Sequence, residues 1–477
     1  MIPVATPEPS APQVAYHKAY TWAISAVAAL GGLLFGYDWV VIGGAKPFYE
    51  EFFHLTAAWQ QGWAMSCALA GCLIGALISG KLSDRFGRKR LLIAAAFLFG
   101  ASSLGTALAG TFSHFVLGRI SGGIAIGLAS SLSPMYIAEV SPAWVRGKLV
   151  SLNQLTIVSG ILLAQLMNWA IARPVPAGAT ALQILNSWNG QVGWRWMFGV
   201  TAIPAGLFFV CMFAVPESPR WLAQKRRNHE AHRILARIGG EVYGRQALAE
   251  IEASLPGDVL DGNARNKHEF AMLFQPKTLK ILLLAVVLVV FQQWCGINVI
   301  FNYAEEVFSA AGYNISGILF DIVVTGVVNL VFTVVAITLV DKAGRRFLML
   351  IGSAGLALTY IVLGIGYYEG SHGIYMLLLV VAAIACYAMS LAPVTWVVIA
   401  EIFPNHIRGT GMAFAVSALW IASFILTYTF PLLNHSLGPA VTFWIYAAIC
   451  ILGFVFIEFR LPETKGKTLE EIERALT

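Results

Sequence analysis

Long apolar runs dominate the chain, and short polar segments separate them. Twelve runs between residues 20 and 460 each reach the length of about 20 mainly apolar residues that a membrane-spanning helix needs. One long hydrophilic stretch, residues 217–278, divides the runs into six and six. The pattern predicts an all-α, polytopic membrane protein with 12 transmembrane helices in two related six-helix halves.

The same pattern sets the expected domain boundaries. The expected segments are a cytoplasmic N-terminus (1–19), an N-terminal six-helix bundle (20–216), an intracellular helical linker (217–278), a C-terminal six-helix bundle (279–460) and a cytoplasmic C-terminal tail (461–477). Lysine and arginine cluster after the second, fourth, eighth and tenth runs, whereas the segments after the third, seventh, ninth and eleventh contain none. The positive-inside rule therefore places both termini and the linker in the cytoplasm. Short external loops predict a plasma membrane of the bacterial inner-membrane kind.

Composition excludes several classes of protein. Hydrophobic residues make up 58% and charged residues 12% of the 477 positions, whereas soluble domains carry about 25% charged residues. This composition disfavours a soluble enzyme and a nucleic-acid-binding protein. The net charge of +6 does not indicate a nucleic-acid-binding patch, because the lysines and arginines lie in short clusters between the apolar runs. All six cysteines fall in apolar runs, which favours small buried hydrophobes over a disulfide or metal framework. We expect no metal, no cofactor and no enzymatic activity.

The two halves repeat each other in sequence. Residues 137–147, IAEVSPAWVRG, return as residues 399–409, IAEIFPNHIRG, with six identities in eleven positions. Residues 84–89 return in similar form as residues 341–346. Related halves of one orientation, with a binding site near their interface, are typical of alternating-access transporters. The repeat therefore favours a transporter over an enzyme.

Two opposite charges lie at matching depth in the first half. Asp38 lies about six residues before the external end of the first predicted helix, and Arg119 lies about six residues into the fourth. Both are therefore roughly 9 Å deep and can form an ion pair. Charges inside a membrane are costly and usually functional. A purely structural ion pair is the alternative.

Several motifs in order along the chain resemble the signatures of sugar porters in the major facilitator superfamily. They are GKLSDRFGRK at 80–89, the RxxGG pattern at 119–123, PESPRWL at 216–222, the QQxxGIN pattern at 292–298 and PETKG at 462–466. The resemblance covers residues 20–471. It is stronger to the bacterial proton-coupled symporters of D-xylose and hexoses than to the mammalian facilitative glucose transporters.

The resemblance implies import of a monosaccharide such as xylose, glucose or galactose by proton symport. In similar symporters an aspartate at the position of Asp38 carries the proton, and an arginine at the position of Arg119 tunes the pKa of that aspartate. Facilitators of the family have an asparagine at the position of Asp38. A proton-independent facilitative uniporter with the same pocket stays open as an alternative, whereas a non-transporting sugar sensor is disfavoured. The expected partners are the sugar, a proton and the lipid bilayer, with no nucleic acid, and we expect a monomer.

A sugar pocket should be polar but uncharged, because amide groups match hydroxyls as both donors and acceptors. Aromatic rings can pack on the C–H faces of the sugar. The candidate contacts, which the resemblance implies for all but the last, are Phe35, Gln154, Gln292, Gln293, Asn298, Asn329, Trp396 and Trp420. Hydrogen bonding between helices is the alternative for an isolated amide such as Asn329. Leu419 and Asn302 stand where related porters usually have an amide and a tyrosine, which leaves the identity of the sugar open.

Charged residues at the predicted cytoplasmic helix ends form a repeated set. Its members are Asp84, Arg85, Arg88, Glu139, Arg146, Glu217, Asp341, Arg345, Glu401 and Arg408. The carboxylates and arginines of this set can pair across the two halves, so we expect a latch that is intact when the cytoplasmic side is closed. Anchoring of loops at the membrane surface is the alternative.

Overall fold

Apolar helices account for nearly the whole computed structural model, which describes residues 16–176, 178–254, 272–310, 315–371, 373–403 and 407–465. Within these ranges there is no β-strand, and eleven helical segments are long and apolar enough to cross a membrane. The last of them, Gly409–Arg460, contains a break at Gly438, whose φ of 76° ends one helix and starts another. Division at this break gives twelve spans, and the predicted all-α membrane fold is confirmed.

The first half contains five long helices and one broken helix. The long ones are α1 (Lys18–Phe53), α2 (Ala58–Phe86), α3 (Arg88–Ala107), α4 (Phe112–Val140) and α5 (Arg146–Ile171). After the short α6 (Ala181–Asn186), the sixth span is built from the π-helix η1 (Asn189–Gly193), α7 (Trp194–Gly199) and α8 (Ala202–Ala214). Two polar helices follow, α9 (Pro219–Gln224) and α10 (Asn228–Ser254).

The second half uses more broken helices than the first. Its elements are α12 (Pro276–Trp294), α13 (Ile297–Asn302), α14 (Ala304–Ala310), α15 (Ile315–Ala343), α16 (Arg345–Tyr368), α17 (Ile374–Met389), α18 (Leu391–Ile402) and α19 (Arg408–Arg460). Gly296 separates α12 from α13, and Ser390 separates α17 from α18. Discontinuous helices are where transporters of this architecture place their binding sites.

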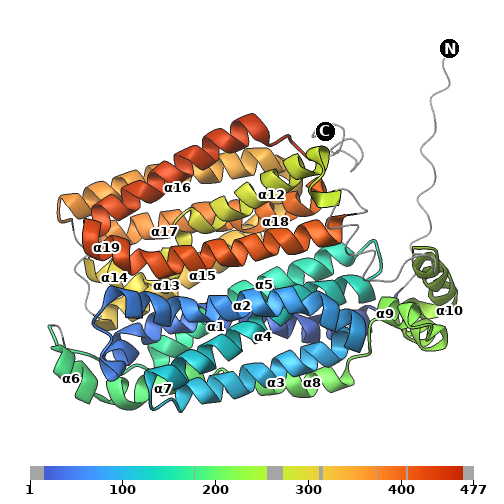
Figure 1. Ribbon diagram of the computed structural model, residues 1–477, viewed down its shortest axis with the longest axis horizontal. Coiled ribbons are helices and arrows are strands. Elements are labelled where there is room, and N and C mark those ends of the chain that lie inside the picture. Colours follow the sequence, from blue (N-terminus) through green and yellow to red (C-terminus); the bar gives the residue numbers. More distant parts are fainter. Residues whose placement is uncertain are drawn as a thin grey trace.

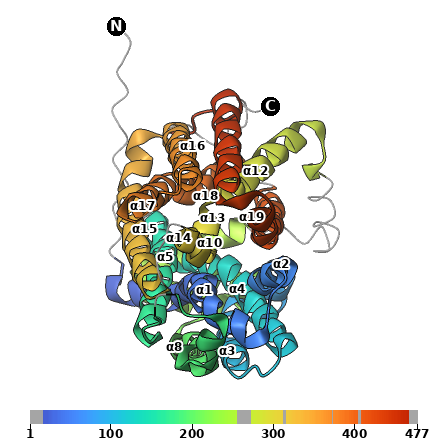
Figure 2. The ribbon, with the colours of Figure 1, turned by 90° about the vertical axis from the view of Figure 1, so that its left-hand side faces the viewer.

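The two halves lie against each other as two layers of roughly parallel helices (Figure 1). Helices α1–α8 form one layer and α12–α19 the other, while α9 and α10 stand at one end of both. We call this end the linker end, and the end that carries α6 and α14 the far end. Viewed from the far end, α1, α2, α4 and α5 lie between the outer helices of the first half and the second half (Figure 2).

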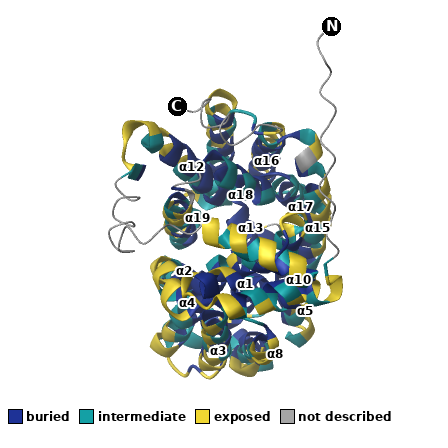
Figure 3. Cartoon of the chain, turned by 90° about the vertical axis from the view of Figure 1, so that its right-hand side faces the viewer, coloured by how far each residue is buried: buried dark blue, intermediate teal, exposed yellow. Residues whose placement is uncertain are grey.

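Burial is arranged as expected for a protein whose surroundings are apolar. The inner faces are buried, and exposed positions gather on outer surfaces and on α10 (Figure 3). Large apolar side chains such as Phe97, Leu207 and Leu452 are more than half exposed. Inside the first half, glycines let helices touch through their backbones: a Cβ on Gly36 would overlap the backbone oxygen of Ile157.

Candidate functional site

The two intramembrane charges of the first half form a buried ion pair. Arg119 of α4 donates from Nη1 to Oδ1 of Asp38 on α1 at 2.6 Å and from Nη2 to the Asp38 backbone oxygen at 3.3 Å. Only 7% of Asp38 and 3% of Arg119 are exposed. The guanidinium also lies over the Phe198 ring, 5.4 Å from its centroid. Arg119 is thus held by two hydrogen bonds to Asp38 and by the Phe198 ring.

A small cavity adjoins this ion pair. It measures about 10 Å³, about the size that one water needs, and its lining includes Asp38, Arg119, Trp39 and Asn302. Oδ2 of Asp38, Nε of Arg119 and Oδ1 of Asn302 are buried and have no hydrogen-bond partner in the described ranges. The second carboxylate oxygen of Asp38 is therefore available to a proton. Asn302 brings a polar group from the second half to the same cavity.

The three amides of the QQxxGIN motif form a hydrogen-bonded chain. Asn298 donates from Nδ2 to Oε1 of Gln293 at 2.6 Å, and Gln293 donates from Nε2 to Oε1 of Gln292 at 3.0 Å. Gln292 in turn reaches the backbone oxygen of Ala392 on α18 at 3.4 Å. Gly296, with φ of +85°, provides the turn between Gln293 and Asn298, and a Cβ there would press on the Tyr446 ring. All three amides are buried at the break in the helix.

Aromatic rings from both halves meet beside the cavity. The Trp420 ring of α19 lies 5.9 Å from Phe35 and 6.0 Å from Trp39, both on α1. Nε1 of Trp420 is buried without a partner among the described residues, although indole N–H groups usually find one. Leu419, the second departure from the family pattern, is buried next to it.

The remaining predicted sugar contacts are not joined to the amide chain by any recorded contact in the described structure. Asn329 on α15 is buried, whereas Gln154 on α5 and Trp396 on α18 are half-buried. Their roles stay predictions.

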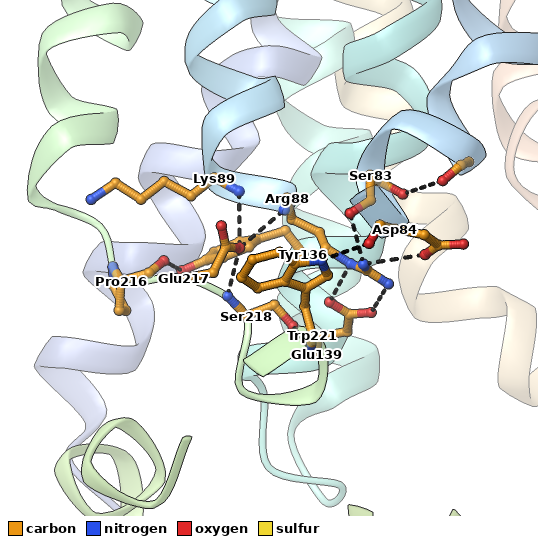
Figure 4. A network of polar contacts seen from close by, with 11 residues as sticks. Ser83, Asp84, Arg88, Lys89, Tyr136, Glu139, Pro216, Glu217, Ser218 and Trp221 are labelled. Atoms are coloured by element: carbon orange, nitrogen blue, oxygen red, sulfur yellow. Dashed lines mark hydrogen bonds and ion pairs between the residues drawn. The ribbon is translucent and has the colours of Figure 1, made fainter. Parts of the chain in front are cut away.

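At the linker end, Arg88 organises the charges of the first half (Figure 4). It donates from Nε and Nη2 to the two carboxylate oxygens of Glu139 at 3.1 and 3.2 Å, a bidentate pair. Glu217 accepts from the backbone N–H groups of Arg88 and Lys89 at 3.0 and 3.1 Å. These are free N–H groups at the start of α3, where a carboxylate is favoured. Gly87, with φ of +94°, leaves the space that the Glu217 carboxylate occupies.

The second half repeats this arrangement at the start of α16. Arg345 donates from Nη2 to Glu401 at 3.1 Å, and Glu463 accepts from the backbone N–H groups of Arg345 and Arg346 at 2.9 and 3.1 Å. Gly344, with φ of +96°, takes the place of Gly87. Partial burial alone would raise the pKa of Glu463, but backbone hydrogen bonds from Lys465, Arg345 and Arg346 hold this pKa below its ordinary value.

At the linker end the ion pairs among the described residues lie within each half. Pairing across the halves in a state that is closed at this end stays a prediction. Glu139 and Glu401 each pair with the arginine of their own half, because α4 and α18 end beside the starts of α3 and α16. Of the other predicted members, Asp84 is exposed and reaches Arg88 at 3.4 Å, and Arg85 and Arg146 are exposed. The side chains of Asp341 and Arg408 lie outside the described residues.

Comparison with known proteins assigns the family. A family model of the sugar (and other) transporters matches residues 24–476. The chain belongs to this family. It is 40% identical over 489 residues to the D-xylose-proton symporter of Escherichia coli, covering 96% of each chain. It is 39% identical over 469 residues to the arabinose-proton symporter of Bacillus subtilis, covering 98% of this chain and 97% of the relative.

Solved structures of transporters agree with the fold. The inward-open structure of the xylose transporter XylE from E. coli superposes with a TM-score of 0.82 at 40% identity, covering 96% of this chain and 100% of that chain. The predicted membership of the major facilitator sugar porters is confirmed.

The transporter also contains an ion cluster at the far end that the sequence reasoning missed. Lys46 of α1 pairs with Glu306 at 2.6 Å and Glu305 at 3.7 Å, both on α14, and with Glu50 on its own helix at 3.0 Å. The lysine side chain is 4% exposed. The i,i+4 spacing of Lys46 and Glu50 and the adjacent glutamates were signals in the sequence. Only the fold brings α1 and α14 together.

Proposed function

We propose that this transporter imports a monosaccharide together with a proton, by alternating access, across the plasma membrane of a bacterium with both termini in the cytoplasm. The buried pair of Asp38 and Arg119, with one carboxylate oxygen free, carries the proposal. The names of the relatives, proton symporters of xylose and of arabinose, support it. Family membership alone would equally fit a uniporter.

The proton acts by changing the charge of the Asp38 carboxyl. Arg119 stabilises the ionised form, whereas a proton on Oδ2 makes the carboxyl neutral and weakens the pair. A site with a neutral carboxyl can be enclosed in an apolar surrounding at lower cost than one with a separated charge. The proton then leaves on the cytoplasmic side, where the pH is higher. Proton and sugar movement are coupled because only certain loading states can be enclosed.

The sugar would bind between the halves, at the amide chain of Gln292, Gln293 and Asn298. Its hydroxyls can replace the hydrogen bonds that the three amides make with one another, so no buried donor is left unpaired. Phe35 offers a ring face from the first half, and Trp420 of the second half offers a ring face and an N–H that has no partner among the described residues. Gln154, Asn329 and Trp396 are proposed as further contacts from α5, α15 and α18.

The conformation supports a cycle that opens alternately at each end. Among the described residues, the ion pairs between the halves lie at the far end, whereas those at the linker end lie within one half. We therefore assign this structure to a state that is closed at the far end and open towards the linker. With the linker in the cytoplasm, this is an inward-facing state, in line with the likeness to the inward-open xylose transporter.

Replacement of Asp38 by asparagine tests the proposal. Asp38→Asn keeps size and hydrogen bonding but removes the titratable group. In proteoliposomes, the parent should show sugar-induced alkalinisation of the outside medium, and the variant should lose it while it still exchanges preloaded sugar by counterflow. A panel of radiolabelled pentoses and hexoses in the same vesicles identifies the sugar.

Asp321→Asn is a matched control, because Asp321 is another buried acid with an unpartnered oxygen, on α15. This control should keep proton movement. Persistent proton movement in Asp38→Asn would remove Asp38 as the carrier. Absent proton movement in the parent would leave a facilitative uniporter.

A further inference from the structure

The far-end cluster places three carboxylates around one ammonium group. Lys46 and Glu50 belong to the first half, and Glu305 and Glu306 to the second. With every group ionised the cluster would carry two negative charges in excess. The exposed fractions of the glutamate side chains are only 11%, 22% and 20%, so water screens this excess poorly. One oxygen each of Glu50 and Glu306 is buried without a partner in the described part of the chain.

The groups around Glu306 explain its protonation. The charges that act on it come from Lys46 and Glu50 on α1 and from Glu305 beside it, and the tyrosine hydroxyls of Tyr49 and Tyr303 flank the cluster. α15 and α16 also pack near α14. The hydroxyl of Tyr367 on α16 donates to the backbone oxygen of Val307, and Asp321 is the buried acid of α15. Burial, opposed in part by Lys46, raises the pKa of Glu306 to about 8. α14 lies beyond the apolar span Pro276–Asn302.

We propose that this cluster binds a proton from the external medium each time the far end closes and returns it to the same side when that end opens. Opening would separate α1 from α14. Lys46 and Glu50 would remain together as a neutral pair, and Glu305 and Glu306 would become exposed carboxylates. The proton at this site is therefore distinct from the transported proton at Asp38. The inference rests on the proposed function for the alternation of the two ends and for the side that the far end faces.

The sign of the pH effect follows from the two states of Glu306. Its carboxyl has an ordinary pKa, near 4.3, when exposed, and a raised pKa when the far end is closed. The closed state therefore binds more protons than the open state. Between these two pKa values, the ratio of closed to open molecules should fall by up to about tenfold for each unit by which the external pH rises.

Spin-label distances across the far end test this inference. Labels on Trp59→Cys of α2 and Leu437→Cys of α19 report the separation of the halves there, since both positions are exposed. The partly buried native Cys211 and Cys386 are replaced by serine. Distances are measured over a series of pH values in a background with Asp38→Asn, which removes the titration of the transport site. We expect the short-distance population to decrease as pH rises.

Two substitutions in the cluster should act in opposite directions. Glu306→Gln mimics the protonated carboxyl, so the far end should stay closed and lose most of its pH dependence. Lys46→Met removes the only cation of the cluster, so closure should require a lower pH than in the parent. The matched control is Glu369→Gln. Glu369 is an exposed acid that directly follows α16 at the far end, so this variant should behave as the parent.

The outcomes separate the inference from the proposed function. An unchanged pH dependence in Glu306→Gln, or a pH-independent parent, would overturn the inference. So would equal opening in Glu306→Gln and Lys46→Met, which is expected if the cluster is only a structural ion pair. Failure of symport would appear instead as absent sugar-induced proton movement in the protein that retains Asp38, whatever the distances show.

Discussion

The two ends of this transporter use buried charge differently. At the linker end, Arg88 and Arg345 pair with Glu139 and Glu401 inside their own halves. At the far end, Lys46 pairs across the interface with Glu305 and Glu306. A pair within a half can persist when the halves rock, whereas a pair between halves must break. The linker-end pairs therefore stabilise each half, and the far-end cluster stabilises one conformation of the whole molecule.

The largest expected effect tests the claim that the linker-end pairs belong to single halves. Arg88→Ala leaves the Glu139 carboxylate, 10% exposed, without its partner, and should cost about 3–5 kcal/mol of stability. Arg345→Ala should cost less, because its pair is more exposed. The measurement is thermal unfolding of purified protein. In double-mutant cycles, Arg88 should couple to Glu139 and not to Glu401, and coupling between Arg88 and Glu401 would contradict the comparison.

One substitution made at both ends sharpens the contrast. Gly43→Ala at the far end places a Cβ 2.8 Å from the backbone oxygen of Asn302 across the interface. Closure there should become weaker by about 1–3 kcal/mol, the usual cost of overpacking. Gly80→Ala at the linker end meets nothing within 4 Å and should leave the conformation unchanged. Spin-label distances across the far end measure the closed population in each variant. Equal closed populations in Gly43→Ala and Gly80→Ala would count against a far end that is held by close packing.

The proposed sugar site lies between the two ends, where neither charge network reaches. Gln293 is the central member of the amide chain, so Gln293→Ala should leave a buried donor and a buried acceptor unpaired. Sugar affinity should fall by about 1–3 kcal/mol, as measured by calorimetric titration with the transported sugar. Gln191→Ala, which changes an exposed amide on η1, is the control. Unchanged affinity in Gln293→Ala would remove the amide chain from the pocket.

The smallest expected effect concerns the carboxylates at the helix starts. Glu463 has a lowered pKa, so its stabilising contribution is present above its ordinary pKa and is lost as the pH falls through the lowered value. Glu463→Gln should remove roughly 1 kcal/mol near neutral pH, reduced by partial solvent exposure. The free energies of unfolding of the parent and the variant should become equal at acid pH. Stability curves that stay parallel down to low pH would show that Glu463 contributes nothing through its charge.

Much of the site could be predicted because it depends on local spacing. The depth of Asp38 and Arg119 follows from counting residues in two helices of known rise, and the adjacent amides at Gln292 and Gln293 share one turn. Lys46 was not recognised, because its partners on α14 lie more than 250 residues away in sequence. The pairing of Glu139 with Arg88 was not predicted for a similar reason: the spacing gives the end of a helix but not the neighbour that it meets.

The sequence by itself determined the twelve apolar spans, the two-fold repeat and the types of side chain at each helix end. These features depend on hydropathy and local motifs, which are properties of consecutive residues. Only the tertiary structure decided that Arg88 and Arg345 meet glutamates of their own halves and that α1 and α14 share a buried cation. Burial and charge pairing at an interface depend on which helices meet, and the pattern along one helix carries no record of its partner in space.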